Sequence, residues 1–256
     1  MRTIGLIGGM SWESSALYYR WINETVRDRL GGLHSARVLL LSVDFAGIEQ
    51  MQQAGRWAEA GAVLGEAARS LERGGADLLL LCTNTMHRVA DEIAAAVAIP
   101  LLHIADATGA AITAVGIRRV GLLGTRFTME QAFYRGRLAE RYGLDVLVPQ
   151  ADERQLVHDV IYGELCLGEV RPASRDAYRR VMARLVERGA EAIILGCTEI
   201  TLLVGPDDAT VPLFDTTLIH ANAAVDAALA EDKVAPLAPT DASRIADTAK
   251  RHAETG

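Results

Sequence analysis

The stretch GGADLLLLCTNT, residues 74–85, joins a glycine turn, a run of four leucines and a group of small polar residues. The second half of the chain repeats this order in RGAEAIILGCTE, residues 188–199. Apolar runs of this length between turn residues are typical of strands buried on both faces of a parallel sheet. The repeat therefore indicates two related strand-to-helix turns, each ending in thiol and hydroxyl side chains.

Two further pairs of segments repeat with a similar offset. TIGLIGGMS at 3 matches RVGLLGTRF at 119, and IPLLH at 99 matches VPLFD at 211. All three offsets fall between 112 and 116 residues. The chain is therefore interpreted as a duplicated unit of four strands.

Strands alternate with helical patterns along the whole repeat, which predicts an α/β fold with right-handed crossovers. The duplication favours two pseudo-symmetric Rossmann-like lobes, each a four-stranded parallel sheet flanked by helices, over a single barrel. The expected lobes span residues 1–116 and 117–216, with a cleft between them and a polar tail at 231–256. Helices are expected after the first and fifth strands, at 15–30 and 130–143. The eight predicted strands are 3–8, 37–43, 77–82, 100–104, 119–124, 144–148, 191–196 and 211–214.

Composition excludes several classes of protein. The net charge of −7 over 256 residues argues against a general nucleic-acid binder. The absence of a long apolar segment argues against a membrane span or a signal peptide. Three cysteines, an odd number, suit a reducing compartment, so a cytoplasmic protein is expected.

Lysine is confined to the tail, at Lys233 and Lys250. The body of the fold therefore offers no lysine for a Schiff base with pyridoxal phosphate or for a phosphate clamp. No paired cysteine or histidine spacing suggests zinc. GLIGGM at 5–10 lacks the glycine spacing of a dinucleotide fingerprint, and a tight turn explains it better. These observations predict chemistry without a cofactor or metal.

Open parallel sheets bind ligands beyond the carboxyl ends of their strands, which makes the residues there the site candidates. Aligning the repeats places Thr83 opposite Cys197, and Cys82 opposite Gly196. A thiol at a strand-to-helix turn has its pKa lowered by the helix N-terminus. Two facing half-sites suit inversion at carbon, because one group removes a proton and the other returns one to the opposite face. Cys166 is interpreted as a helix-core residue, and His87 either orients a substrate or caps a helix.

Four motifs together give the chain a family resemblance: NT-x-H at 84–87, GCTE at 196–199, GGMSWES at 8–14 and GTRFTM at 124–129. Over roughly residues 3 to 230 it resembles the aspartate/glutamate racemase family, closest to the L-aspartate/glutamate-specific or broad-specificity amino-acid racemases. The resemblance implies two catalytic cysteines and no cofactor. It also implies a last helix (217–230) that packs back on the first lobe, and a homodimer. From charge and hydropathy, neither a nucleic-acid nor a membrane partner is expected.

The first half-site departs from the family pattern. The family has Cys-Asn-Thr where this chain has CTNT, so the catalytic position holds Thr83, with Cys82 one residue early. Alternate residues of a strand face opposite ways, which argues against Cys82 as a substitute. Cys197 is expected to be the competent acid/base, ionised by its turn and by His87, and Thr83 the opposing proton donor or relay. The residues expected to bind substrate are Met10, Ser11, Gln52, Asn84, Thr85, Thr125, Thr128, Thr198 and Glu199.

Other activities remain open at this level. A thiol hydrolase would use Cys197 as nucleophile and His87 as base. A decarboxylase or a cis–trans isomerase of a small carboxylic acid would suit a related fold. A non-catalytic amino-acid sensor would also have two lobes and a cleft, and Thr83 would then mark lost activity.

Overall fold

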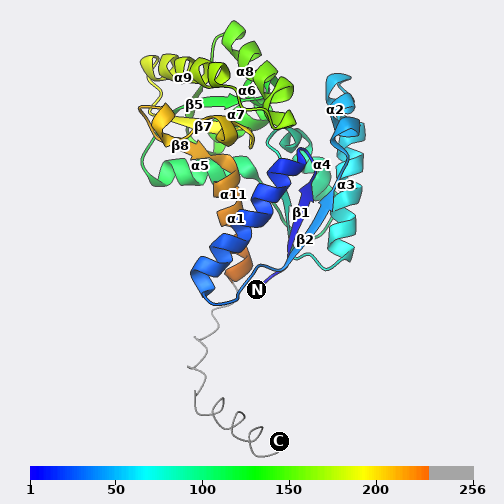
Figure 1. Cartoon of the computed structure of the whole chain (residues 1–256). Helices are drawn as coiled ribbons and strands as arrows, with labels where there is room; N and C mark the ends of the chain where they lie inside the picture. Colours follow the sequence, from blue (N-terminus) through cyan, green and yellow to red (C-terminus); the bar gives the residue numbers. More distant parts are fainter. Residues whose placement is uncertain (231–256) are drawn as a thin grey trace, which may run out of the picture.

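The computed structural model describes residues 1–230, and the predicted tail at 231–256 lies outside the described residues. All eight predicted strands form, and they make two separate parallel sheets of four strands each (Figure 1). The strand orders are β2-β1-β3-β4 and β6-β5-β7-β8, so the second sheet repeats the topology of the first. The predicted duplicated α/β architecture is confirmed. The strands are β1 Ile4–Gly8, β2 Val38–Ser42, β3 Leu78–Leu81, β4 Leu101–Leu102, β5 Arg119–Gly124, β6 Asp145–Leu147, β7 Ala192–Gly196 and β8 Leu213–Asp215.

Helices cover both faces of each sheet. The elements of the first half are α1 Trp12–Leu30, α2 Phe45–Gln53, α3 Trp57–Arg73, η1 Thr85–Val89, α4 Ala90–Ala95 and α5 Ile104–Ala114. Those of the second half are α6 Arg126–Glu130, α7 Ala132–Tyr142, α8 Ala151–Gly163, η2 Leu165–Leu167, α9 Pro172–Glu187, α10 Ile200–Leu203, η3 Pro206–Asp208 and α11 Thr216–Leu229.

Every residue of β1, β3 and β7 is buried, as the continuous apolar runs predict. One face of the first sheet packs on α3 and α4, and the other packs on α1 and α11 through Leu6, Leu80 and Val225. The second lobe has its own core around Leu122, Ile194 and neighbouring helices. Each sheet is therefore packed against its own apolar core, and this core fixes the carboxyl ends of its strands.

The last helix, α11, lies beside α1 although nearly the whole chain separates them (Figure 1). Two hydrogen bonds join the helices, a buried one from the Tyr18 hydroxyl to His220 Nδ1 at 2.8 Å and a partly buried one from Thr25 to Asn222. His220 Nε2 lies 3.0 Å from the Leu102 carbonyl oxygen. Because α11 follows β8 of the second sheet, it fixes that sheet against the first.

Local chemistry explains where elements differ from their predicted bounds. The segment predicted as a strand at 100–104 pairs only at Leu101–Leu102, because the His103 side chain caps α5 by accepting the Ala105 N–H. The helix predicted at 130–143 is interrupted at Gln131, which is extended, so α6 and α7 are separate. Helix α1 begins earlier than expected, because the Ser11 side chain caps it.

Candidate active site

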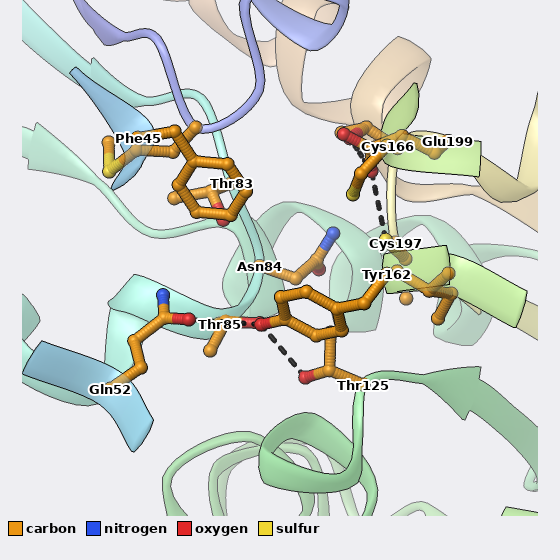
Figure 2. Close-up of a pocket in the computed structure, with 14 residues that line it drawn as sticks. Phe45, Gln52, Thr83, Asn84, Thr85, Thr125, Tyr162, Cys166, Cys197 and Glu199 are labelled. Atoms are coloured by element: carbon orange, nitrogen blue, oxygen red, sulfur yellow. Dashed lines mark hydrogen bonds between the residues drawn. The ribbon is translucent and has the colours of Figure 1, made fainter. Parts of the chain in front are cut away.

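A pocket lies where the carboxyl ends of the two sheets face each other. Thr83 and Cys197 lie on opposite sides of it (Figure 2). Its walls come from both halves of the chain, since the turns after β1 and β3 supply one side and the turns after β5 and β7 the other. The lining residues are Met10, Phe45, Gln52, Thr83, Asn84, Thr85, Thr125, Ile161, Tyr162, Cys166, Gly196, Cys197, Thr198 and Glu199.

Most of the residues predicted for the site line this pocket, and Ser11 and Thr128 are the exceptions. Both of these are buried directly behind it. The Ser11 hydroxyl donates to Glu199 Oε1 at 2.6 Å. Thr128 Oγ1 lies 3.2 Å from Thr125 Oγ1, which in turn lies 2.9 Å from Thr85 Oγ1. Ser11 and Thr128 therefore orient side chains that reach the pocket.

The sequence patterns missed five lining residues. Phe45 begins α2, Ile161 and Tyr162 lie at the end of α8, and Gly196 ends β7. Cys166, interpreted from the sequence as a helix-core residue, packs against the second-lobe core from the short η2 segment and also lines the pocket beside Glu199 (Figure 2). Ile161, Tyr162 and Cys166 follow no strand, so the strand-end rule gave no signal for them, whereas Phe45 lies three residues after β2 and fits that rule.

The strand pairing supports the alignment of Thr83 with Cys197. Ile7 of β1 pairs with Leu81 of β3, and the equivalent Leu123 of β5 pairs with Leu195 of β7. Counting onward from these pairs places Thr83 and Cys197 at equivalent positions of the two lobes.

Cys82 lies on the other side of its strand. It is fully buried in the apolar cluster formed with α1 and α11, which contains Leu6 and Leu80. Burial also raises the pKa of its thiol well above the usual value. Cys82 is therefore part of the core, and Thr83 is the residue that faces the pocket.

The Cys197 thiol is hydrogen-bonded to the buried carboxylate of Glu199. The thiol donates to Glu199 Oε2 at 2.9 Å, and the Thr198 hydroxyl donates to the same oxygen at 2.6 Å. The other oxygen, Oε1, accepts from Ser11 and from Ser14 at 2.8 Å. Four donors from both lobes thus satisfy Glu199, which is only 3% exposed.

The expectation that Cys197 is ionised by its turn was wrong. Burial raises the pKa of the Cys197 thiol well above its usual value, and the adjacent Glu199 carboxylate raises it further. Helix α10, which follows the turn, has only four residues and provides little dipole to oppose this. The resting state is a protonated thiol that donates a hydrogen bond.

The expectation that His87 helps to ionise Cys197 is also wrong. Its Nδ1 lies 2.7 Å from the Thr83 carbonyl oxygen, and its Nε2 accepts the Ile104 N–H at 3.2 Å. Because Nε2 is an acceptor, the ring proton is on Nδ1 and donates to Thr83. Burial lowers the pKa of His87 well below its usual value. His87 is a neutral residue that fixes the Thr83 turn, and it offers no base to Cys197.

Asn84 presents an unpaired oxygen atom. The Thr216 hydroxyl donates to the Leu195 carbonyl at 2.8 Å, so it can only accept from Asn84. Asn84 Nδ2 supplies that hydrogen bond at 3.0 Å. This fixes the amide orientation and leaves Asn84 Oδ1, which is buried and has no protein partner, as an acceptor. Such an atom suits a cationic donor on a ligand.

Within residues 1–230, no three His, Cys, Asp or Glu side chains are grouped so as to hold a metal ion. None of the helices in this part of the chain combines the length and the apolar composition that a membrane span requires.

Comparison with known proteins gives consistent matches. The model of the Asp/Glu/Hydantoin racemase family matches residues 7–224. A solved structure from Yersinia pestis, described as a candidate Asp/Glu racemase, is 58% identical, covers 90% of this chain and 100% of its own, and superposes with a TM-score of 0.84.

Two curated relatives match over shorter segments. The glutamate racemase of Pseudomonas aeruginosa is 31% identical over 129 residues, which are 50% of this chain and 47% of that protein. The broad-specificity amino-acid racemase of Bacillus subtilis is 26% identical over 165 residues, or 64% of this chain and 70% of that one. The chain thus spans about half the length of the first of these relatives.

Proposed function

The chain belongs to the Asp/Glu/Hydantoin racemase family, and from that premise we propose that it inverts the α-carbon of free amino acids by two-base proton transfer without a cofactor. One observation carries the proposal: equivalent positions of two duplicated lobes place Thr83 and Cys197 on opposite sides of one pocket. Inversion requires acid/base groups on both faces of the α-carbon. The restriction of lysine to Lys233 and Lys250 supports a mechanism without a pyridoxal Schiff base.

The hydrogen bond between Cys197 and Glu199 gives the second lobe its base. The thiol proton moves from Sγ to Glu199 Oε2 across 2.9 Å, which leaves a thiolate and a carboxylic acid. The net charge of the pair does not change, so burial does not oppose this shift as it opposes ionisation of an isolated thiol. The thiolate then takes the α-proton, and the electron pair of the C–H bond remains on the substrate as a carbanion.

Thr83 completes the inversion from the opposite face. Its hydroxyl gives a proton to the α-carbon, and the resulting alkoxide regains a proton from water. Glu199 then gives the proton it took from Cys197 to the hydroxide left by that water, which restores the resting state of both half-sites. Thr83 is held for this role through its main chain, since its carbonyl accepts from His87 and its N–H donates to Leu81 at 2.8 Å. In the reverse direction Thr83 is the weak partner, because a hydroxyl is far less acidic than a thiol.

The polar residues around the two groups account for substrate binding. Asn84 Oδ1 accepts from the α-ammonium group, because it is a buried acceptor without a protein partner. The hydroxyls of Thr85 and Thr125 donate to the α-carboxylate and stabilise negative charge as the carbanion forms. The relatives are named for glutamate, for Asp/Glu or for a broad set of amino acids, which supports a free amino acid as the substrate class. Following the family resemblance, we also propose a homodimer, which sedimentation velocity tests.

Exchange of the α-proton with solvent tests the proposed function. The protein is incubated in D₂O with each proteinogenic L-amino acid, and α-deuterium is followed by NMR while chiral chromatography follows the D-enantiomer. A racemase incorporates deuterium and forms the enantiomer together. A thiol hydrolase or a sensor does neither, and a decarboxylase releases carbon dioxide, so the absence of exchange with all substrates contradicts the proposal.

The same assay tests independence of cofactors. Activity is expected to survive dialysis against a metal chelator and a carbonyl reagent, because the body of the chain offers neither an internal lysine nor a ligand cluster. Full loss that added pyridoxal phosphate restores would contradict a cofactor-independent mechanism.

A further inference from the structure

One wall of the pocket is made by side chains that take no part in the proton transfers. Phe45 and Gln52 of α2 meet Tyr162 of α8, from the other half of the chain. The Tyr162 hydroxyl donates to Gln52 Oε1 at 2.9 Å, and its ring stacks on Phe45 with centroids 6.5 Å apart. We call Phe45, Gln52 and Tyr162 the recognition wall.

The recognition wall is polar but uncharged. Gln52 is fixed at both ends of its amide, because Nε2 donates to Met86 Sδ at 3.0 Å while Oε1 accepts from Tyr162. The second lone pair of Oε1 and the lone pairs of the phenol oxygen remain for a ligand. Burial raises the pKa of Tyr162, so its phenol stays neutral. The wall therefore offers one amide and one phenol to whatever lies against it.

The lining of the pocket contains an acidic side chain but no basic one. Of the 14 lining residues, all in the described part of the chain, Glu199 alone is an acid, and none is Lys, Arg or His. Two arginines close in sequence to lining residues lie over aromatic rings that are not part of the lining. The Arg88 guanidinium lies 4.3 Å from the Trp57 ring centroid, and that of Arg126 lies 5.9 Å from the Phe127 ring. A side-chain carboxylate would be buried beside Glu199 without a cation.

On the premise that the pocket racemises amino acids, we propose that the recognition wall selects an uncharged substrate side chain and that Gln52 and Tyr162 bind it by hydrogen bonds. The α-carboxylate is balanced by the α-ammonium group, whereas a second carboxylate has no partner. Asparagine and glutamine, which match aspartate and glutamate in shape, are therefore the better substrates.

Binding of the isosteric pairs tests this selectivity apart from catalysis. The Cys197→Ser variant keeps a donor for Glu199, and calorimetry compares its affinity for L-asparagine with L-aspartate and for L-glutamine with L-glutamate. We expect each amide to bind about 100-fold more tightly than its acid, from the desolvation of an unpaired carboxylate. Acids that bind as tightly as their amides would overturn the proposal. Preferential amide binding without α-deuterium exchange in the wild type would instead defeat only the proposed racemase activity.

Tyr162→Phe tests the role of the phenol. The substitution keeps the stacked ring and removes one neutral hydrogen bond, so we expect kcat/KM for glutamine to fall about 3- to 10-fold relative to methionine. Tyr19→Phe, on the exposed face of α1, is the matched control and should leave this ratio unchanged. An equal loss for both substrates in Tyr162→Phe would indicate a structural role and overturn the assignment of the phenol.

Discussion

Replacing Thr83 by cysteine should make the two half-sites chemically equal. The hydroxyl at this position is a poor acid and a poor base, whereas a thiol has a reference pKa of about 8.5. A positioned general base contributes about 10²- to 10⁴-fold to the rate. In the wild type we therefore expect the two kcat values, for the L- and the D-enantiomer, to differ by about 100-fold. In Thr83→Cys they should come within about tenfold of each other, mainly because kcat rises for the poorer enantiomer.

The substitution is conservative where it is made. Thr83 is 7% exposed, and the hydrogen bonds that hold its turn come from the main chain, so they survive a change of side chain. The assay measures initial rates in both directions by chiral chromatography at saturating substrate. For every variant kcat/KM must be equal in the two directions, because the enantiomers have equal free energy in water. This equality is an internal check on the data.

Cys82→Ala is the matched control. Cys82 is buried in the core against Leu6 and Leu80, so its loss should lower the free energy of unfolding by about 1 kcal/mol and leave the kinetics unchanged. If Cys82→Ala abolishes α-deuterium exchange and Thr83→Cys leaves the ratio of kcat values as it was, Cys82 is the first-lobe catalyst and the reasoning fails.

Three further predictions concern the second lobe and the fold. Cys197→Ala should lower kcat by about 10²- to 10⁴-fold, measured by α-deuterium exchange, and a wild-type rate would contradict its role. Glu199→Gln removes the proton acceptor of Cys197 and should lower kcat by about 100-fold with a changed pH profile of kcat; an unchanged profile would assign it to structure alone. Burial lowers the pKa of His103 and His220 to about 3, so below pH 6.5 the unfolded chain binds protons that the folded chain does not. Urea unfolding should show stability falling between pH 6.5 and pH 5, by up to about 1.4 kcal/mol per pH unit for each histidine, and less steeply in His103→Gln.

The fold could be predicted because it depends on patterns of apolar and turn residues that are local in the sequence. Buried parallel strands produce continuous apolar runs, and a duplicated unit repeats them at a nearly constant offset, so all eight strands were found. The strand-end residues were found for a related reason, since parallel strands place their carboxyl ends at one edge of the sheet. The strand-end rule and the alignment of the two repeats were sufficient to identify Thr83 and Cys197 as equivalent positions.

The features that sequence reasoning missed depend on packing between distant segments. Tyr162 and Cys166 reach the pocket from the end of a long helix and a short turn, where no pattern marks them. The protonation of Cys197 depends on burial and on a carboxylate that also accepts from two first-lobe serines, so the turn alone suggested the wrong direction for the pKa shift. His87 was misread because its two partners, Thr83 and Ile104, are main-chain groups that only the folded structure identifies.

Duplication explains why one site has two sides, but the two sides have diverged in charge. The second lobe adds Glu199 next to its thiol, and hydroxyls of Ser11 and Ser14 from the first lobe hold that carboxylate. The first lobe has Asn84 next to Thr83, and its free atom is a neutral carbonyl oxygen. Among the described lining residues, the one acidic side chain therefore lies on one face of the substrate. A base takes a proton from carbon most easily when a neighbouring group shares its charge, as Glu199 does for Cys197. Removal of the α-proton by Cys197 is therefore favoured, and the first lobe is the side from which the proton returns.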